Sequence, residues 1–166
     1  MFTIGDTVIY GTQGVCRISD ITKMKFANEI HEYYVLISIS DNKSTAYVPI
    51  DNEKLTSKMK SVLSPQQVDE LIDSIAGANT EWIDDDANRK ECFAAAIKSG
   101  DMHELIEIIN MLHQHRRLLS ESKKTLHTAD EKFLREAEKL LNNEISYSLG
   151  IKASEVPQYI RNRIAV

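Results

Sequence analysis

The residues of this chain that could do chemistry are five histidines, two cysteines and the run Asp84-Asp85-Asp86. They do not stand in the spacings of known sites: there is no phosphate-binding GxxxxGKS/T loop, no HExxH and no CxxC. His113 and His115 are two positions apart, so on a helix they point to different sides and make a poor metal pair. The aspartate run lacks the spaced ligands and closing Glu of a calcium loop. We therefore expect a protein that is not an enzyme and needs no metal or cofactor.

The remaining candidates are residues that bind a partner, and the first is Trp82, the only tryptophan. It stands in a polar stretch, residues 79–86, between two regions of different pattern. One interpretation is a core plug that closes a helical bundle, the commoner fate of a large aromatic residue. The other is an exposed wedge or anchor, because tryptophan is enriched at binding hot spots. The residues alone leave both open.

The second candidate is a cluster of cations in a chain whose formal net charge is −5. Residues 51–87 carry nine acids against three lysines, whereas residues 88–166 carry thirteen basic residues against eleven acids. Within the second half, Glu121 is the single acid inside a cluster that could hold phosphate, formed by Arg116, Arg117, Lys123 and Lys124. The alternative is an ordinary solvated helix surface.

The elements that must position these residues differ between the two ends of the chain. Residues 7–10, 15–21, 32–39 and 44–49 alternate with period two and are separated by glycine-containing or polar turns, which predicts short strands. Pro49 cannot donate to a strand ladder, so we expect it at a strand end or a sheet edge. About five strands in some fifty residues indicate a small curled antiparallel barrel with a usable edge.

From residue 64 onward the apolar residues repeat with helical period. Ser64-Pro65, Asp101 and Thr128 begin predicted helices, Gly77, Gly100 and Gly150 end them, and Ser154 is expected to cap a last one. The sequence therefore predicts an α+β protein: a small antiparallel β-barrel over residues 1–55, followed by a compact all-α domain over residues 56–166. We expect Cys16 and Cys92 to be buried thiols, and we expect neither a secretion signal nor a membrane span.

Five landmarks stand along the chain, and the first is its opening, Phe2-Thr3-Ile4-Gly5-Asp6-Thr7-Val8-Ile9-Tyr10. The others are Tyr47-Val48-Pro49, the isolated Trp82, Lys98-Ser99-Gly100-Asp101 and Ala129-Asp130-Glu131-Lys132. In type and order these landmarks resemble those of the CarD/CdnL family of bacterial transcription regulators, and they cover nearly the whole chain. The strand module alone also occurs in transcription-repair coupling factors, but the helical half excludes that large ATPase.

The resemblance implies a Tudor-like, SH3-like module that binds the β subunit of RNA polymerase by strand pairing at an edge. Carried over to this chain, that contact involves Lys23, Met24, Lys25, Thr45, Ala46, Tyr47, Val48 and Pro49. Some relatives carry a basic residue where this chain has Tyr47, so an aromatic contact must replace a charged one here. The alternative for Tyr47 is packing across the strands.

The resemblance further implies that the helical domain meets promoter DNA at the upstream edge of the melted −10 region. Trp82 then acts as a wedge in the minor groove and stabilises the open complex. The candidate phosphate contacts are Arg89, Lys90, Arg116, Arg117, Lys123, Lys124 and Lys132. Relatives often have basic residues soon after the tryptophan, whereas Asp84-Asp85-Asp86 follow it here, so we expect weak, salt-sensitive binding without sequence specificity.

We accordingly expect a cytoplasmic protein that reaches the nucleoid through RNA polymerase. We expect a monomer, with self-association through the β edge as the alternative. A second hypothesis for its function is a polymerase-bound adaptor that recruits another protein through the acidic and helical surface without touching DNA.

Overall fold

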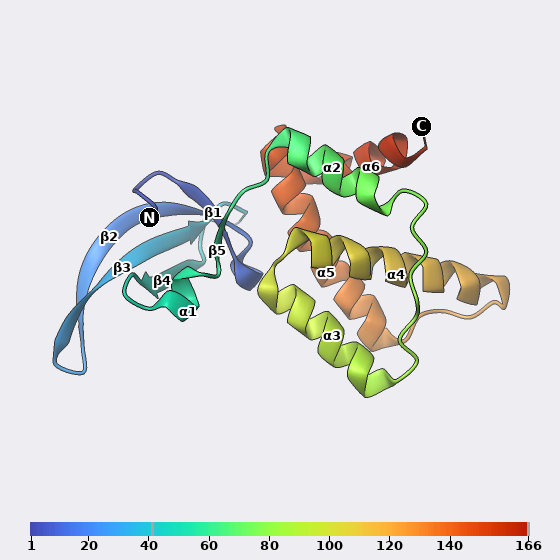
Figure 1. Cartoon of the computed structure of the whole chain (residues 1–166), viewed down its shortest axis with the longest axis horizontal. Coiled ribbons are helices and arrows are strands. Elements are labelled where there is room, and N and C mark those ends of the chain that lie inside the picture. The colour runs from blue at the N-terminus through green and yellow to red at the C-terminus, as the bar shows by residue number, and fades with distance from the viewer. Residues whose placement is uncertain (41, 166) are drawn as a thin grey trace. The chain divides into compact units, whose positions relative to one another are not determined.

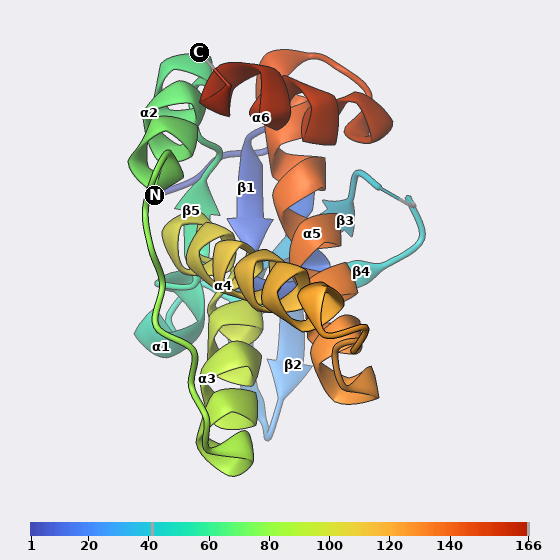
Figure 2. The ribbon, with the colours of Figure 1, turned by 90° about the vertical axis from the view of Figure 1, so that its right-hand side faces the viewer.

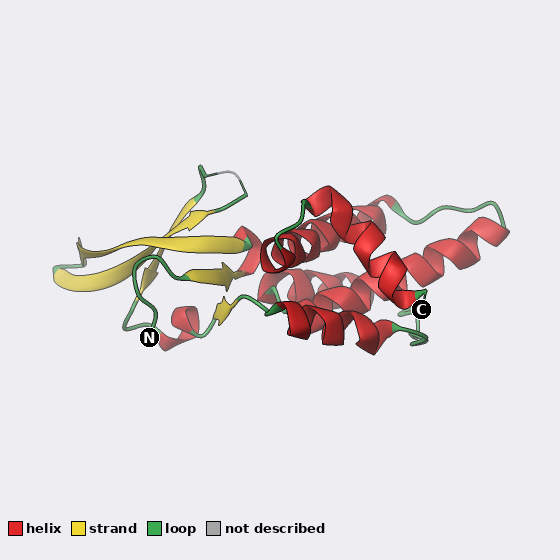
Figure 3. Ribbon diagram, turned by 90° about the horizontal axis from the view of Figure 1, so that it is seen from above, coloured by secondary structure: helices red, strands yellow, loops and turns green. Residues whose placement is uncertain are grey.

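The computed structural model describes residues 1–40 and 42–165 and divides into two compact units, Met1–Val62 and Leu63–Val166. All the strands lie in the first unit, and the second is helical (Figures 1 and 3). This confirms the predicted α+β class and the order of the two parts.

The first unit is a five-stranded antiparallel sheet. Its strands are β1 (Thr7–Tyr10), β2 (Val15–Phe26), β3 (Glu29–Ser38), β4 (Thr45–Pro49) and β5 (Met59–Ser61), in the spatial order β4-β3-β2-β1-β5. A one-turn 3-10 helix, η1 (Gly11–Gln13), joins β1 to β2, and α1 (Glu53–Thr56) precedes β5. The small antiparallel β module that the sequence predicts is therefore present. In the described part of the chain β4 and β5 do not pair with each other, so its sheet is not closed.

The long hairpin of β2 and β3 forms most of the sheet (Figure 1). Polar and apolar residues alternate in both strands, and a two-residue turn joins them. Ala27 and Asn28 have φ values of 48° and 69°, the left-handed conformation of tight hairpin turns. One face of the sheet is buried around Val8, Ile18 and Leu36, each with no solvent exposure. A bulge between Ile18 and Asp20 shifts the register of the hairpin.

The first unit runs past residue 55, where we placed the domain boundary, because β5 pairs with β1: Val8 lies opposite Ser61 and Tyr10 opposite Met59. Residues 51–63 thus contain a helix and a strand, neither of which the sequence predicts. Leu63 belongs to the helical unit. Its N–H donates to Glu144 Oε1 over 3.1 Å, and its carbonyl accepts from Ser148 Oγ over 2.6 Å.

The second unit contains α2 (Pro65–Ile75), α3 (Asp86–Ser99), α4 (Met102–Glu121), α5 (Thr128–Leu149), η2 (Ala153–Glu155) and α6 (Val156–Ile164), as Figure 2 shows from the helical side. The predicted caps at Ser64 and Asp101 are confirmed, and both accept backbone N–H groups of the first turn. Gly100 and Gly150 end α3 and α5 with φ values of 64° and 66°. Ser154 does not cap the last helix, because it lies inside η2.

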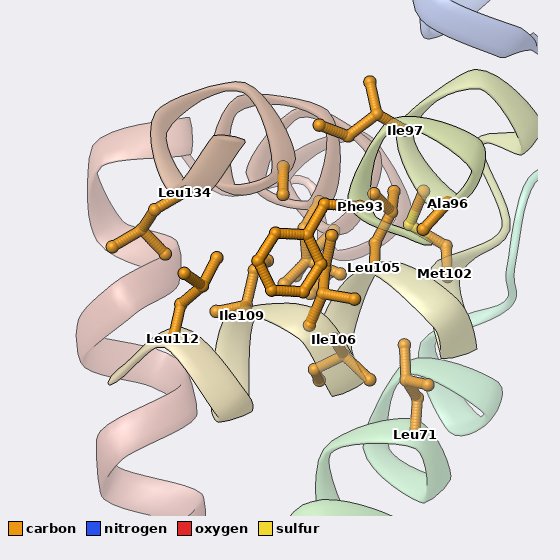
Figure 4. Packing of buried hydrophobic residues seen from close by; sticks show 14 of the residues in the cluster. Leu71, Phe93, Ala96, Ile97, Met102, Leu105, Ile106, Ile109, Leu112 and Leu134 are labelled. Atoms are coloured by element: carbon orange, nitrogen blue, oxygen red, sulfur yellow. The ribbon is translucent and has the colours of Figure 1, made fainter. Parts of the chain in front are cut away.

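The helical core forms where one face of each helix meets the others. Phe93 on α3 has no solvent exposure, and Figure 4 shows its ring pointing toward Ile106 and Ile109 of α4. At the end of the chain Arg163 binds Asp73 through two hydrogen bonds of 2.7 and 2.6 Å, which ties α6 to α2. Cys16 is buried as expected, but Cys92 is exposed on α3, where the helix turns a polar face to solvent.

Candidate functional site

Trp82 lies in the loop between α2 and α3 and is half-buried, neither sealed in the core nor free. Its indole packs edge-on against Phe93, with the ring centroids 6.4 Å apart, and stacks on His115 of α4 at 3.6 Å. The same indole lines a hollow of about 440 Å³, which we call the Trp82 hollow. The other residues that line it are Asp84, Asp86, Arg89, Lys90, His115, His127 and Ala129.

The loop that carries Trp82 has no regular structure, yet it is bonded to α4 just before the indole. Gln114 Nε2 donates to the carbonyl of Ala78 over 2.8 Å, and Gln114 Oε1 accepts from the N–H and hydroxyl of Thr80. Asn110 adds a contact of 3.4 Å to the same carbonyl. The Gln114 side chain thus satisfies backbone groups that a neighbouring strand would otherwise bind, and it fixes the position of the backbone just before Trp82.

Arg89 does not lie at the surface where a phosphate contact would be expected. Its side chain is 4% exposed and forms a bidentate pair with Asp130, which is 1% exposed, over 3.1 and 3.2 Å. Nη1 donates to the carbonyl of Ile83 over 2.9 Å, and the guanidinium carbon lies 4.8 Å from the indole centroid. The donors of Arg89 are therefore directed at protein groups.

The acidic run after Trp82 has structural roles. Asp85 caps α3 by accepting the N–H of Asn88 over 2.7 Å. Asp86 accepts from Arg89 over 2.7 Å and from Lys90 over 2.6 Å. The hydrogen bond from Lys90 is the main reason why the pKa of Asp86 is lowered. Two of the three aspartates thus organise the start of α3, and Lys90 brings a partly neutralised charge to the hollow.

The electrostatics of the hollow favour a neutral imidazole at His115. Partial burial lowers its pKa, and the positive charge of Arg89 lowers it further, while Asp130 and Asp84 act in the opposite direction. His127 lies at the N-terminus of α5 and lines the same hollow. Two histidines, two basic residues and two aspartates thus line the hollow together with the indole.

The other predicted phosphate contacts are exposed but lie elsewhere on the helical unit. Arg116 donates to Nδ1 of His113 over 2.9 Å and lines a separate groove beside α6. Lys132 on α5 approaches Glu136 at 3.9 Å. Arg117, Lys123 and Lys124 lie at and beyond the end of α4, where Lys123 adopts a φ of 56°. Lys90 and Arg89 are the predicted basic residues that share the hollow with Trp82.

The predicted polymerase contacts in the first unit lie on two different edges of the sheet. The N–H of Ile50 donates to the carbonyl of Glu32, and the carbonyl of Ser44 accepts from the N–H of Ser38. The even-numbered residues of β4 therefore direct their backbone groups at β3. Thr45, Tyr47 and Pro49 therefore turn their backbone groups outward, while Ala46 and Val48 face β3. Tyr47 is 52% exposed. Pro49 lies at a position whose backbone points away from β3, so its missing N–H removes no hydrogen bond between the strands.

The second edge belongs to the outer half of β2. β1 pairs with β2 only as far as Arg17, so in the described part of the chain the side of residues 19–26 away from β3 has no strand partner. Met24 lies opposite His31, and by alternation Lys23 and Lys25 direct their backbone groups outward. The tip of this hairpin exposes Phe26 and Ile30. A single partner strand cannot pair with both edges.

Three contributors to the Trp82 site were not predicted: His115, Gln114 and Asp130. Their contacts to the loop and α3 cross 33 to 41 residues of sequence, and no local pattern marks them. The described residues contain no group of three or more His, Cys, Asp or Glu side chains placed to hold a metal ion. Over the same residues, no helix combines the length and the apolar character that crossing a bilayer requires.

Comparison with known proteins accounts for both units. Residues 2–62 match the model of the CarD-like/TRCF RID domain, and residues 70–161 match that of the CarD C-terminal domain. The "Putative transcription factor YdeB" of Bacillus subtilis (strain 168) is 23% identical over 159 residues, which cover 96% of this chain and 99% of that protein. The two matches follow the same order as the two units. This chain is therefore a member of the CarD family of bacterial transcription regulators.

Proposed function

We propose that this protein binds the β subunit of RNA polymerase through its sheet and stabilises the open promoter complex by placing Trp82 against DNA at the upstream edge of the −10 bubble. The observation that carries the proposal is the indole itself, fixed by bonds to its loop yet lining an accessible hollow. A rigid aromatic edge next to cations suits a partly unstacked minor-groove step, which apolar wedges are known to hold open.

The DNA contact is weak by itself in this proposal. Lys90 contacts phosphate from the Trp82 hollow, while Arg116, Arg117, Lys123, Lys124 and Lys132 add charge from α4 and α5. Exposed Asp84 and Asp85 repel the same backbone, so affinity for free DNA is low, independent of sequence and strongly salt-dependent. Tethering to polymerase compensates by raising the effective concentration of Trp82 at the promoter.

Docking on polymerase uses the outward side of β4. A strand of the β subunit adds to this edge and bonds to the backbone of Thr45 and Tyr47, and the exposed Tyr47 ring packs on the added strand. The outer edge of β2, with Lys23, Met24 and Lys25, is a second surface for the same subunit.

The energetic consequence follows from differential binding. A factor shifts the closed-to-open equilibrium only by the difference between its affinities for the two states. A preference of about 1.4 kcal/mol for melted DNA changes that ratio tenfold. One indole in an unstacked step, together with a few phosphate contacts, is of this order.

The decisive experiment measures the lifetime of open complexes with wild-type protein, Trp82→Ala and Trp82→Phe on several promoters. We expect Trp82→Ala to shorten the lifetime and Trp82→Phe to be intermediate, because a smaller ring fills less of the step. Circular dichroism and binding to polymerase serve as controls for folding and docking. Equal lifetimes for all three proteins would remove the wedge.

The exposed carboxylates Asp84 and Asp85 beside the indole favour a second candidate, an adaptor that docks on polymerase and recruits a basic protein. The two functions differ in the DNA footprint. The wedge extends polymerase protection upstream of the −10 element, and this extension disappears with Trp82→Ala, whereas an adaptor leaves the footprint unchanged.

We further propose that the protein works in the cytoplasm on nucleoid-bound polymerase as a monomer. The open edge of β4 offers the route for self-association. Binding of the β subunit to that edge would compete with it.

A further inference from the structure

We propose that Arg89 is the positioning residue of the Trp82 indole and that Asp130 holds Arg89 in this role. The inference rests on the function proposed for Trp82 and adds the device that keeps its ring in one orientation. Arg89 then acts through the indole rather than on DNA.

The first support is the way the guanidinium is fixed. Nε and Nη2 of Arg89 meet the two oxygens of Asp130 at 3.1 and 3.2 Å, which sets both the position and the plane of the group. Nη2 also donates to Asp86 over 2.7 Å. Because the Arg89 and Asp130 side chains are 4% and 1% exposed, water does not compete for the two bonds between them.

The second support is that the fixed guanidinium contacts both the ring of Trp82 and the backbone of the next residue. Its carbon lies 4.8 Å from the indole centroid, within the range of a cation–π contact, and such contacts strengthen when they are desolvated. Nη1 donates to the carbonyl of Ile83, the residue directly after the tryptophan, over 2.9 Å. Ring and peptide are therefore held by the same side chain.

This arrangement requires arginine rather than any cation. A lysine ammonium is a point charge and cannot bind both oxygens of Asp130, reach the Ile83 carbonyl and lie over the ring together. The same occupancy leaves Arg89 without the exposed donors that a phosphate contact needs. The prediction of Arg89 as a phosphate contact is therefore replaced by a positioning role.

The functional consequence concerns stiffness. When an indole enters a DNA step, restacking of the bases opposes it. The indole holds the step open only if its side-chain rotamer is fixed. Gln114 fixes the chain before Trp82, and Arg89 fixes the ring and the chain after it. A protein without the Arg89–Asp130 pair keeps the wedge but loses its support.

The test uses Arg89→Lys, which retains the charge, with Arg135→Lys on the exposed side of α5 as the matched control. Trp82 is the only tryptophan, so fluorescence excited at wavelengths that the six tyrosines do not absorb reports on it alone. We expect Arg89→Lys to increase acrylamide quenching of Trp82 and to shorten the open-complex lifetime at least about threefold, as loss of a desolvated cation–π contact implies. Arg135→Lys should change neither. If Arg89→Lys does not fold, Asp130→Asn is measured in its place.

A double-mutant comparison separates positioning from a direct or purely structural effect. In a Trp82→Ala background, Arg89→Lys should leave the lifetime unchanged. Unchanged quenching of Trp82 in the single variant would overturn the inference, and so would an equal loss of lifetime in both backgrounds. If Trp82→Ala itself has no effect on lifetime, the proposed function fails, and quenching alone still decides whether Arg89 positions the ring.

Discussion

The imidazole of His115 lies parallel to the indole of Trp82, with the ring centroids 3.6 Å apart and 3° between the planes. This stack covers indole surface that would otherwise face solvent. Phe93 and Arg89 contact the same ring, so the indole surface left for a partner is the part that lines the Trp82 hollow. If Trp82 acts as the wedge that we propose, it does so as a supported edge of a ring rather than as a free side chain.

The stack makes the stability of the helical unit depend on pH. Burial and the nearby Arg89 hold the pKa of His115 below its ordinary value, so folding favours the neutral ring. The unfolded imidazole takes up its proton near pH 6.5, and the folded one only at lower pH. The contribution of His115 to the free energy of unfolding is therefore fully present above about pH 6.5, the pKa of the unfolded imidazole. It is lost as the pH falls through the lower pKa of the folded state.

We expect His115→Phe, which keeps a flat ring but cannot take up a proton, to lose less stability than wild type between pH 7.5 and pH 5. Urea unfolding followed by circular dichroism at several pH values measures this. The charged groups that face His115, namely Arg89, Asp130, Asp84 and His127, are the same in both proteins. Parallel curves for the two proteins would show that His115 does not contribute.

The buried pair of Arg89 and Asp130 makes a second prediction for stability. Asp130→Ala removes the buried partner of a guanidinium that is 4% exposed and leaves it only the exposed carboxylate of Asp86, so we expect a loss of about 3–5 kcal/mol in the free energy of unfolding. Replacing both partners together, Arg89→Met with Asp130→Leu, should restore most of this loss because no charge remains buried. Urea titration of the three proteins checks it, and a double variant as unstable as Asp130→Ala would contradict the assignment.

Much of the fold was readable from local signals. Ser64-Pro65, Asp101, Gly100 and Gly150 mark helix ends by chemistry that acts within a few residues, and all four positions hold. That the sheet stays open could not be predicted, because closure depends on pairing between strands far apart in sequence. β5 was missed because it is three residues long and follows a polar stretch.

The site was less readable, since its determinants are long-range. Asp130 lies in the first turn of α5, a common place for an acidic residue, and only the fold shows that its carboxylate turns inward to Arg89. Arg89 was grouped with Lys90 because they are adjacent, yet one helical step buries the first and exposes the second. Charge type alone therefore could not separate a positioning residue from a surface contact.

Docking through β4 predicts different outcomes for two changes at one position. Tyr47→Pro removes a backbone N–H that points away from β3, so the sheet itself should still fold. A partner strand on this edge would lose the hydrogen bond to that N–H and would clash with the proline ring. We expect binding to the polymerase β subunit to weaken about tenfold or more, and more than with Tyr47→Ala, which keeps the N–H. Interferometry with immobilised polymerase measures it. If Tyr47→Pro binds as well as wild type while Lys23→Pro does not, the outer edge of β2 is the docking strand.

The end of α4 stores strain in a residue that we propose as a phosphate contact. Lys123 adopts a φ of 56°, and the N–H groups of Lys123 and Lys124 close the helix on Ser120 and Leu119. A side chain in the left-handed region costs about 1–2 kcal/mol, partly offset by the greater freedom of glycine in the unfolded chain. Lys123→Gly should therefore raise the free energy of unfolding by about 0.5–1 kcal/mol while weakening DNA binding. Lys124→Gly, whose φ is negative, removes the same charge and should bring no gain in stability. Equal unfolding curves for the two variants would show that the left-handed conformation costs nothing here.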